Sequence, residues 1–193
     1  MKTIKENVNH KIIINKSVFI TYLFRVDNEE KVLSYINTIK HQYKDATHCC
    51  YAYIVDKIER FHDANEPVGT AGKPILEVLL KNNLNYVVAI VVRYYGGTKL
   101  GYGGLIRAYS RSVSEALKLT KLENVVWHDK IMLNFPYYLT KEIDYLLKDC
   151  HIIKREYKEK ITYLVLIERR LLSDIINKLQ LLNEVEIKKN NEF

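Results

Sequence analysis

His62, Asp63 and Glu66 place an imidazole and two carboxylates within five residues of one loop. Such a group can relay protons or ligate a divalent cation, so these side chains are the candidate catalytic residues. The loop holds no nucleophile beside them, and a catalytic site needs a base, a partner and an oxyanion donor together. Acidic side chains near Pro and Gly more often satisfy turn backbone or cap the next helix. We therefore favour a protein that binds rather than catalyses.

The glycines mark two unusual loops around these residues. All seven glycines of the 193-residue chain lie between Gly69 and Gly104. Glycine is used where the backbone takes a positive φ or where another group approaches the main chain closely. We therefore expect special backbone geometry in residues 62–74 and 94–104. The first loop carries the motif positions Glu66, Pro67, Gly69, Thr70, Ala71, Gly72 and Pro74.

The second loop leaves an apolar run and leads into a helical pattern, which makes it a candidate anion site. N–H groups at a helix N-terminus attract an anion, and Lys99 and Arg107 would add positive charge. The spacing is not that of a P-loop, because Gly101 is followed by Tyr102, and no GxGxxG pattern is present. The sequence thus disfavours nucleotide hydrolysis. The alternative is that the glycines only allow the helix to pack tightly on its sheet.

Cations and tyrosines alternate near this loop. Arg107 and Arg111 are four residues apart on one helical face, and Tyr94, Tyr95 and Tyr102 lie among the charges. Aromatic side chains flanked by cations bind single-stranded nucleic acid without reading its sequence. The alternative is a solvated arginine face beside tyrosines of the core. The predicted nucleic-acid or anion-binding residues are Lys73, Arg93, Tyr94, Gly96, Gly97, Lys99, Gly101, Gly103, Gly104, Arg107 and Arg111.

Basic charge is concentrated in the first part of the chain. Residues 1–122 hold 18 Lys and Arg against 11 Asp and Glu, whereas residues 123–193 hold 12 of each. The whole net charge of +7 therefore lies in the first part. A local positive field of this kind attracts phosphate, which indicates a phosphate-bearing partner.

Composition disfavours several other classes of protein. Cys49, Cys50 and Cys150 cannot form a paired disulfide framework, and the six histidines lack zinc-ligand spacing, so we expect no metal and no cofactor. The apolar runs stop far short of the roughly 20 residues that cross a bilayer, and the N-terminus lacks the apolar core of a signal peptide. We expect a cytoplasmic protein with no membrane partner. The sequence gives no indication of oligomeric state.

Residues 1–122 should supply the elements that position the two loops. Strands are predicted over 17–26, 46–55 and 86–93, the last as a buried central strand because it is uniformly apolar. Asn28 should cap a helix over 29–43, and Thr70 a short helix that ends near Lys81. A longer helix is predicted from Gly103 to about Leu119, with an inward stripe. That stripe comprises Leu105, Ile106, Tyr109, Val113, Ala116 and Leu117.

Residues 123–193 restart the pattern and form a predicted second domain. Strands over 127–135, 152–158, 162–167 and 184–188 combine with helices over 140–148 and 172–181 in the order βαββαβ. That order is the ferredoxin-like split motif. The predicted fold class is therefore α+β, with a basic first domain and a second domain of balanced charge that orients or regulates it.

Two long motifs in this order resemble the signature of the IMPACT/YigZ family. The first runs Glu66-Pro67-Val68-Gly69-Thr70-Ala71-Gly72-Lys73-Pro74-Ile75-Leu76. The second runs Arg93-Tyr94-Tyr95-Gly96-Gly97-Thr98-Lys99-Leu100-Gly101-Tyr102-Gly103-Gly104-Leu105-Ile106-Arg107-Ala108-Tyr109. The resemblance covers nearly the whole chain, in the bacterial two-domain form. It departs from the family where Ala64 and Asn65 replace Asp-Gly, and the lost carboxylate weakens a metal or acid–base site.

The resemblance implies a particular fold and function. The first domain would be similar to the second domain of ribosomal protein S5, and the second domain to a ferredoxin-like domain of elongation factor G. Because both neighbours handle RNA, the leading hypothesis is a non-enzymatic regulator of translation that binds RNA, the ribosome or a translation complex through its basic Gly-rich surface. One alternative is an enzyme acting on a phosphorylated or peptide-like small molecule. Another is a regulatory module that binds a protein partner.

Overall fold

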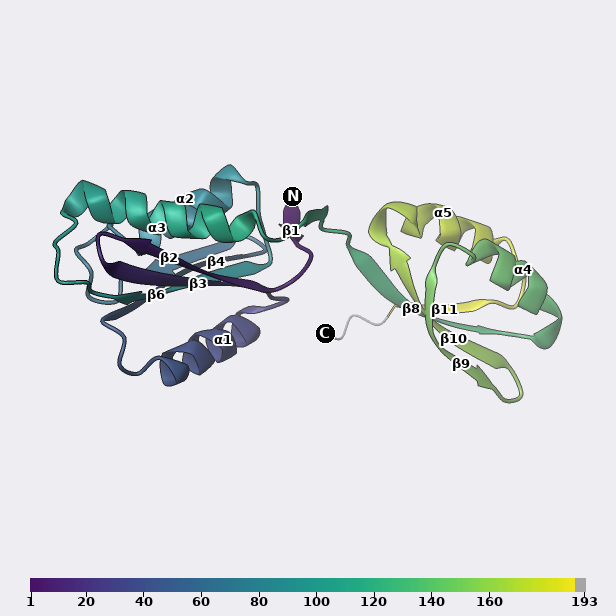
Figure 1. The fold of residues 1–193 in the computed structure, drawn as a ribbon. Helices are drawn as coiled ribbons and strands as arrows, with labels where there is room; N and C mark the ends of the chain where they lie inside the picture. The colour runs from purple at the N-terminus through teal and green to yellow at the C-terminus, as the bar shows by residue number, and fades with distance from the viewer. Residues whose placement is uncertain (190–193) are drawn as a thin grey trace. The chain divides into compact units, whose positions relative to one another are not determined.

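The computed structural model describes residues 1–189 and divides the chain into two compact units, Met1–Val125 and the part from Val126 onward. Each unit has its own sheet and its own core (Figure 1). Both units mix helices and strands, which confirms the mixed α and β composition predicted from the sequence. None of the helices in residues 1–189 is both long enough and apolar enough to span a membrane.

A five-stranded sheet in the order β2-β3-β6-β4-β5 organises the first unit. Each neighbouring pair of strands is antiparallel. Strand β6 lies at the centre and is buried at its first seven residues, which explains its uniformly apolar sequence. The bounds of the strands are β2 Val8–Ile14, β3 Ser17–Arg25, β4 His48–Val55, β5 Ile58–His62 and β6 Val87–Tyr94.

Helices cover both faces of this sheet (Figure 1). α2 (Gly72–Lys81) and α3 (Tyr102–Leu117) lie on one face, and α1 (Glu29–Gln42) lies on the other. Alternate side chains of the strands therefore enter two separate clusters of buried residues. The start of α1 confirms the predicted cap, because the Asn28 side chain accepts a hydrogen bond from the Lys31 N–H at 2.9 Å.

The apolar stripe of α3 faces the sheet. Tyr109, Val113 and Ala116 are fully buried, and Tyr109 meets Phe19 of β3 edge-on with ring centroids 5.2 Å apart. This arrangement confirms the stripe predicted from helical spacing, except that Ile106 is only partly buried. The packing fixes the N-terminal turn of α3 above one end of β6.

The sequence pattern did not reveal the elements at the borders of the first unit. β1 (Lys2–Ile4) pairs antiparallel with β7 (Leu122–Asn124), and β2 and β5 form the edges of the large sheet. In β5 only Ile58 is partly buried and the other residues are exposed. A strand of this kind lacks the apolar alternation by which strands are recognised in a sequence.

The second unit runs βαββαβ, the order of elements predicted from the sequence. Its four-stranded sheet has the order β11-β8-β10-β9, with antiparallel neighbours. In its core the rings of Phe135 and Tyr163 meet edge-on at 4.9 Å. The elements are β8 His128–Phe135, a 3-10 turn Tyr137–Leu139, α4 Thr140–Leu146, β9 His151–Tyr157, β10 Ile161–Glu168, α5 Arg169–Gln180 and β11 Glu186–Lys189.

Candidate nucleic-acid interface

Asp63 organises the loop that precedes α2. Its Oδ1 accepts hydrogen bonds from the N–H groups of Ala71 at 3.0 Å and Gly72 at 2.8 Å. Its Oδ2 accepts a third, from the N–H of Gly69, at 2.9 Å. The carboxylate thus caps the first turn of α2, where the helix dipole favours negative charge. The Asp63 carboxylate therefore has a structural role, because both of its oxygens already accept backbone hydrogen bonds.

Thr70 does not cap α2, and that prediction was wrong. The Thr70 hydroxyl donates to the Pro67 carbonyl oxygen at 2.7 Å, and the residue is fully buried. The first N–H groups of α2 are instead bound by Asp63. Because this cap comes from across the loop, the local spacing that normally identifies a cap does not reveal it.

Glu66 is buried beneath the second Gly-rich loop. Its Oε1 accepts a hydrogen bond from Nη1 of Arg93 at 2.6 Å and another from the hydroxyl of Tyr109 at 2.7 Å. The side chains of Glu66 and Arg93 are only 3% and 5% exposed. Arg93, which the sequence placed among the anion-binding residues, therefore directs its charge at Glu66 and not at the surface. Loss of either partner would leave a buried charge without compensation.

His48, Cys50 and Tyr109 surround the Glu66 carboxylate. His48 Nε2 lies 3.7 Å from Glu66 Oε1, and Cys50 Sγ lies 3.4 Å from the Tyr109 hydroxyl. Burial raises the pKa of the Cys50 thiol to about 12. Burial also raises the pKa of the Tyr109 hydroxyl far above its usual value. Both groups therefore stay protonated near neutral pH, and neither is an activated nucleophile.

The structure does not bring His62, Asp63 and Glu66 together as one reactive group. His62 Nδ1 accepts the N–H of Ala64 at 3.0 Å, Asp63 binds backbone N–H groups, and Glu66 binds Arg93. Across the described residues, no cluster of three or more His, Cys, Asp or Glu side chains could hold a metal ion. Each candidate catalytic residue thus already has a structural partner.

The neighbouring glycines Gly96 and Gly97 meet different requirements. A Cβ on Gly96 would stand 2.0 Å from the carbonyl carbon of Lys16, in the turn between β2 and β3. Gly97 faces open space but has a φ of +83°, and Gly101 has a φ of +70°. These glycines serve backbone geometry, as the sequence predicted for residues 94–104. Gly103 lies in the first turn of α3 next to Gly104.

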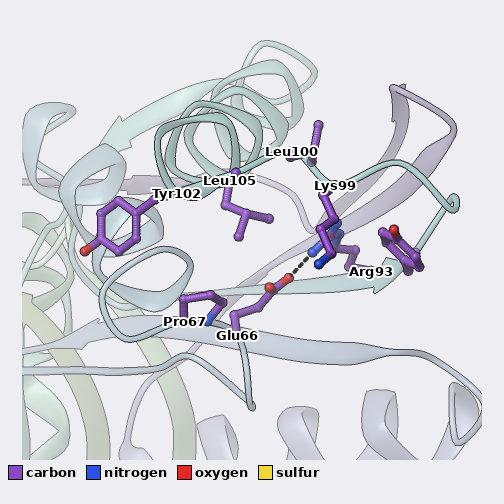
Figure 2. A pocket seen from close by; sticks show the side chains of 9 residues that line it. Glu66, Pro67, Arg93, Lys99, Leu100, Tyr102 and Leu105 are labelled. Atoms are coloured by element: carbon purple, nitrogen blue, oxygen red, sulfur yellow. Dashed lines mark hydrogen bonds and ion pairs between the residues drawn. The ribbon is translucent and has the colours of Figure 1, made fainter.

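A cavity of about 250 Å³ lies between the two Gly-rich loops (Figure 2). The ion pair of Glu66 and Arg93, drawn as a dashed line in Figure 2, forms part of its wall. Pro67, Leu100 and Leu105 give the wall an apolar part. Its other side chains are Tyr95, Lys99 and Tyr102.

Three predicted cations remain available at the surface, and one of them, Lys99, lines this cavity. Lys73, Lys99 and Arg107 are exposed, and none of them forms an ion pair within residues 1–189. Arg111, predicted to act with them, donates from Nε to Oε1 of Glu115 at 2.7 Å. Its charge is therefore partly offset. Among the predicted cations, Lys73, Lys99 and Arg107 therefore carry positive charge that no ion pair within residues 1–189 offsets.

The three tyrosines of the second loop point to different sides. Tyr102 is 60% exposed and Tyr95 is 46% exposed. The guanidinium carbon of Arg93 lies 5.7 Å from the Tyr95 ring centroid. Tyr94 instead donates its hydroxyl to Asp45 at 2.9 Å and packs against the core on the α1 side of the sheet. Tyr95 and Tyr102 can stack on a ligand, whereas Tyr94 cannot reach it.

Several residues of this site were missed from the sequence. Ser17 Oγ accepts the N–H of Gly96 at 3.2 Å and lies 3.4 Å from Nη2 of Arg93. Tyr109 was assigned only to the apolar stripe, although its hydroxyl binds Glu66. Leu100, between Lys99 and Gly101, was assigned no role. The signal for Tyr109 was its polar tip on a buried face, because a buried hydroxyl requires a partner.

Comparisons with known proteins show which sequences this chain resembles. The profile of the Impact N-terminal domain matches residues 15–117. The chain is 40% identical over 183 residues to the IMPACT family member YvyE of Bacillus subtilis, covering 87% of this chain and 80% of the relative. It is 36% identical over 152 residues to the IMPACT family member YigZ of Escherichia coli, covering 75% of this chain and 74% of the relative. The crystal structure of a hypothetical protein aligns with a TM-score of 0.71 at 29% identity, covering 100% of this chain and 98% of that one.

The fold and site define a mixed α and β protein whose first unit exposes unpaired cations beside a small cavity. The chain belongs to the IMPACT family. This confirms the resemblance drawn from the two motifs. At the point where the chain departs from the family pattern, Ala64 and Asn65 have φ values of +47° and +66°. The loop therefore keeps a left-handed turn without the usual glycine.

Proposed function

We propose that this chain regulates translation by binding single-stranded RNA, on the ribosome or in a translation complex. The binding surface comprises Lys73, Tyr95, Lys99, Tyr102 and Arg107, and is termed the cationic surface below. The observation that carries the proposal is the three exposed cations without ion pairs in the described part of the chain, next to two exposed rings. Cations that contact phosphates and rings that stack on bases together bind single strands without sequence readout.

Binding is favoured over catalysis by the way the acidic side chains are used. Asp63 caps α2 and Glu66 compensates Arg93, so neither is free to transfer protons in a reaction. The buried thiol of Cys50 stays protonated. An enzyme acting on a phosphorylated or peptide-like small molecule would need an activated group at this site. The proposal therefore assigns the protein a non-enzymatic role in the cytoplasm, where translation takes place.

We further infer the fold of each unit. The second unit is ferredoxin-like, an inference supported by its βαββαβ order and by strands arranged 4-1-3-2 when β8 to β11 are counted in sequence. The first unit is similar to the second domain of ribosomal protein S5. The resemblance of its two motifs supports that inference, and so does its sheet with the Gly-rich loop leading from β6 into α3.

The proposal is tested by ribosome co-sedimentation and by binding of fluorescein-labelled oligoribonucleotides. The variant Lys99→Glu with Arg107→Glu should lose most of the binding at low salt. The matched control is Lys57→Glu with Lys81→Glu, which makes the same change of charge at the opposite end of the sheet, in the β4–β5 turn and at the last residue of α2. Equal binding by both variants and the unchanged chain would refute the cationic surface.

A protein partner is the second candidate, and one observation favours it. Val68 is 88% exposed and Phe61 is 46% exposed, and both line a second hollow of about 450 Å³ beside Tyr102. Exposed apolar side chains around a hollow often mark a protein contact. Under this alternative, Val68→Asp would abolish retention of a partner after nuclease treatment. Under the RNA proposal, the same nuclease treatment would release all bound material.

A further inference from the structure

The first turn of α3 brings hydrogen-bond donors and no acidic side chain to the edge of the cavity. Within residues 1–189, no acceptor binds the N–H groups of residues 102–104, and no side chain caps this helix. Gly101 and Tyr102, at the start of α3, lie on the cavity wall. The positive end of the helix dipole is therefore exposed beside the cavity.

Arg107 and Lys99 add positive charge at this end of the helix. A Cβ built on Gly103 would lie 3.3 Å from Nη1 of Arg107, so the guanidinium folds back over the first turn. Lys99 lines the cavity and, like Arg107, forms no ion pair within the described chain. A helix N-terminus favours negative charge, and cations there oppose the dipole. An anion bound at this end would compensate the dipole and both cations.

Arg93 supplies a second, independent indication of a ligand on the cavity wall (Figure 2). Its side chain is only 5% exposed. Nη1 donates to Glu66 and Nη2 to Ser17, but Nε has no hydrogen-bond partner within the described residues. Leaving a buried donor unsatisfied costs free energy. A ligand that brings an acceptor oxygen into the cavity is therefore favoured.

This set of donors suits a terminal phosphate better than a phosphate within a strand. A phosphodiester has two free oxygens and a single negative charge. A terminal phosphate has three free oxygens and a charge of about −1.5 to −2 near neutral pH. The first N–H groups of α3, Lys99, Arg107 and Arg93 can together occupy all three oxygens. The Glu66 carboxylate on the same wall opposes the phosphate little, because Arg93 offsets its charge.

The rest of the cavity fits the sugar that carries such a phosphate. Its volume of about 250 Å³ is below the roughly 300–1,000 Å³ of sites that hold drug-sized molecules. A phosphate and one sugar fill that space, and the nucleotides that follow must lie outside it. Pro67, Leu100 and Leu105 give the wall an apolar part that can contact the sugar carbons without reading the base.

We propose that this cavity holds the phosphorylated end of a bound RNA strand. The terminal phosphate accepts hydrogen bonds from the first N–H groups of α3, from Lys99 and from Arg107, and one of its oxygens reaches Nε of Arg93. Nε has almost no exposed surface, so the half-exposed Tyr95 ring, 5.7 Å from the guanidinium carbon, turns aside on binding. This inference rests on the proposed function, because the cationic surface brings the strand to the cavity.

The test uses the full chain and unlabelled uridine oligomers that compete with a fluorescein-labelled oligoribonucleotide, followed by anisotropy at one low salt concentration. The competitors are hexauridine with a 5′-phosphate, hexauridine with a 3′-phosphate, and heptauridine with hydroxyl groups at both ends. All three carry the same number of phosphates, so the comparison isolates the terminal group. We expect one phosphorylated hexamer to bind about tenfold more tightly than heptauridine, as hydrogen bonds to a charged group would give.

The same competition separates failure of the strand-end site from failure of the proposed function. A preference for either phosphorylated hexamer supports the site, and the preferred end gives the direction in which the strand lies. Equal binding of the three oligomers would overturn the strand-end site and leave RNA binding standing. Absence of salt-dependent binding of every oligomer would overturn the proposed function itself.

A mononucleotide distinguishes a strand end from a free phosphorylated molecule. Uridine 5′-monophosphate and uridine 3′-monophosphate carry the same terminal groups as the hexamers but cannot extend along the cationic surface. We expect each to compete at least about tenfold more weakly than the preferred hexamer, because fewer phosphates meet cations. Competition by a mononucleotide as strong as that of the hexamer would overturn the strand end as the ligand.

A matched pair of variants tests whether the end lies in this cavity. Lys99→Gln removes a charge from the cavity wall, whereas Lys73→Gln removes the same charge from a residue outside that wall. Both side chains are exposed, so neither change should disturb the fold. Lys99→Gln should reduce the preference for the phosphorylated hexamer severalfold. Lys73→Gln should weaken all three oligomers and keep their ratio, and an equal preference in both variants would overturn the cavity as the site.

Discussion

At the scale of single residues, the buried group around Glu66 decides what the site can do. The carboxylate holds Arg93 and Tyr109, and the Cys50 thiol lies against the same tyrosine hydroxyl. Burial keeps the thiol and the phenol in their neutral forms. The group therefore forms a polar wall of the cavity in which the Glu66 and Arg93 charges are already paired.

The raised pKa of Cys50 makes the first unit sensitive to alkali. Burial raises this pKa from 9.0 to about 12. In the unfolded chain the thiol ionises first, so the unfolded state binds fewer protons and the free energy of unfolding falls as pH rises between these two values. At pH values below the thiol pKa of the unfolded chain, Cys50 causes no such loss of stability. We expect Cys50→Ser to reduce this pH slope, measured by urea unfolding followed by circular dichroism. An identical pH slope in the variant would contradict the assignment of this loss of stability to Cys50.

Gly96 and Gly97 should differ in their tolerance of alanine. Gly97→Ala meets open space and strains only a positive φ, which costs about 1–2 kcal/mol. Gly96→Ala places a Cβ against the backbone of Lys16, which cannot move without shifting the β2–β3 turn, so we expect about 3 kcal/mol or more. Thermal unfolding of the two single variants measures the difference. Equal losses of stability would mean that the β2–β3 turn can move away from residue 96 at little cost.

At the scale of elements, both loops of the site lie at one end of the same sheet. β6 pairs with β3 and β4, and β4 pairs with β5, so the C-terminal end of β6 lies beside the starts of β3 and β4 and the end of β5. α2 begins after the first loop and α3 after the second. This order brings residues 62–74 and 94–104 together, and α2 depends on a side chain of the first loop for its cap.

Removal of the Asp63 cap should destabilise α2 and the first unit. Asp63→Ala leaves three backbone N–H groups without an acceptor, and we expect a loss of about 2 kcal/mol or more. Thr70→Val should cost only about 1 kcal/mol, because the Pro67 carbonyl keeps its bond from the Thr70 N–H at 3.0 Å. Urea unfolding followed by circular dichroism measures the free energy of unfolding of the two variants. A greater loss for Thr70→Val would restore Thr70 as the residue that organises this helix.

At the scale of the whole molecule, charge is unevenly divided along the chain. The net charge of +7 is contributed by residues 1–122, which include the cationic surface. Each unit has a separate core, and Trp127, the single tryptophan, belongs to the second unit. Its fluorescence therefore reports the second unit when a variant of the first is studied.

The salt dependence of RNA binding should reflect the number of free cations. Three unpaired cations on the cationic surface predict a slope of log K against log salt of about −2 for single strands. Lys99→Glu with Arg107→Glu should bring the slope close to zero. Arg111→Gln should change it little, because Arg111 is already paired with Glu115 and is not expected to contact phosphate. Titrations at several salt concentrations measure the slope. A larger change of the slope in the Arg111 variant than in a Lys99 variant would place the binding surface further along α3.

The sequence by itself determined the features that depend on neighbours along the chain. Helical spacing predicted the stripe of α3, the uniformly apolar run predicted the central strand β6, and Asn28 predicted the start of α1, because side-chain periodicity and capping act within a few residues. The concentration of glycines located both loops of the site. The two motifs identified the family.

Only the tertiary structure decided which of these residues share a site and which are already occupied. Glu66 meets Arg93 and Tyr109 from two other elements, Asp63 replaces Thr70 as the cap, and Tyr94 turns away from Tyr95. These contacts join residues far apart in the sequence, and strand order together with the face on which each side chain emerges sets them. For that reason the sequence could list the cations and carboxylates of the site, but the sheet determined which were left free to bind.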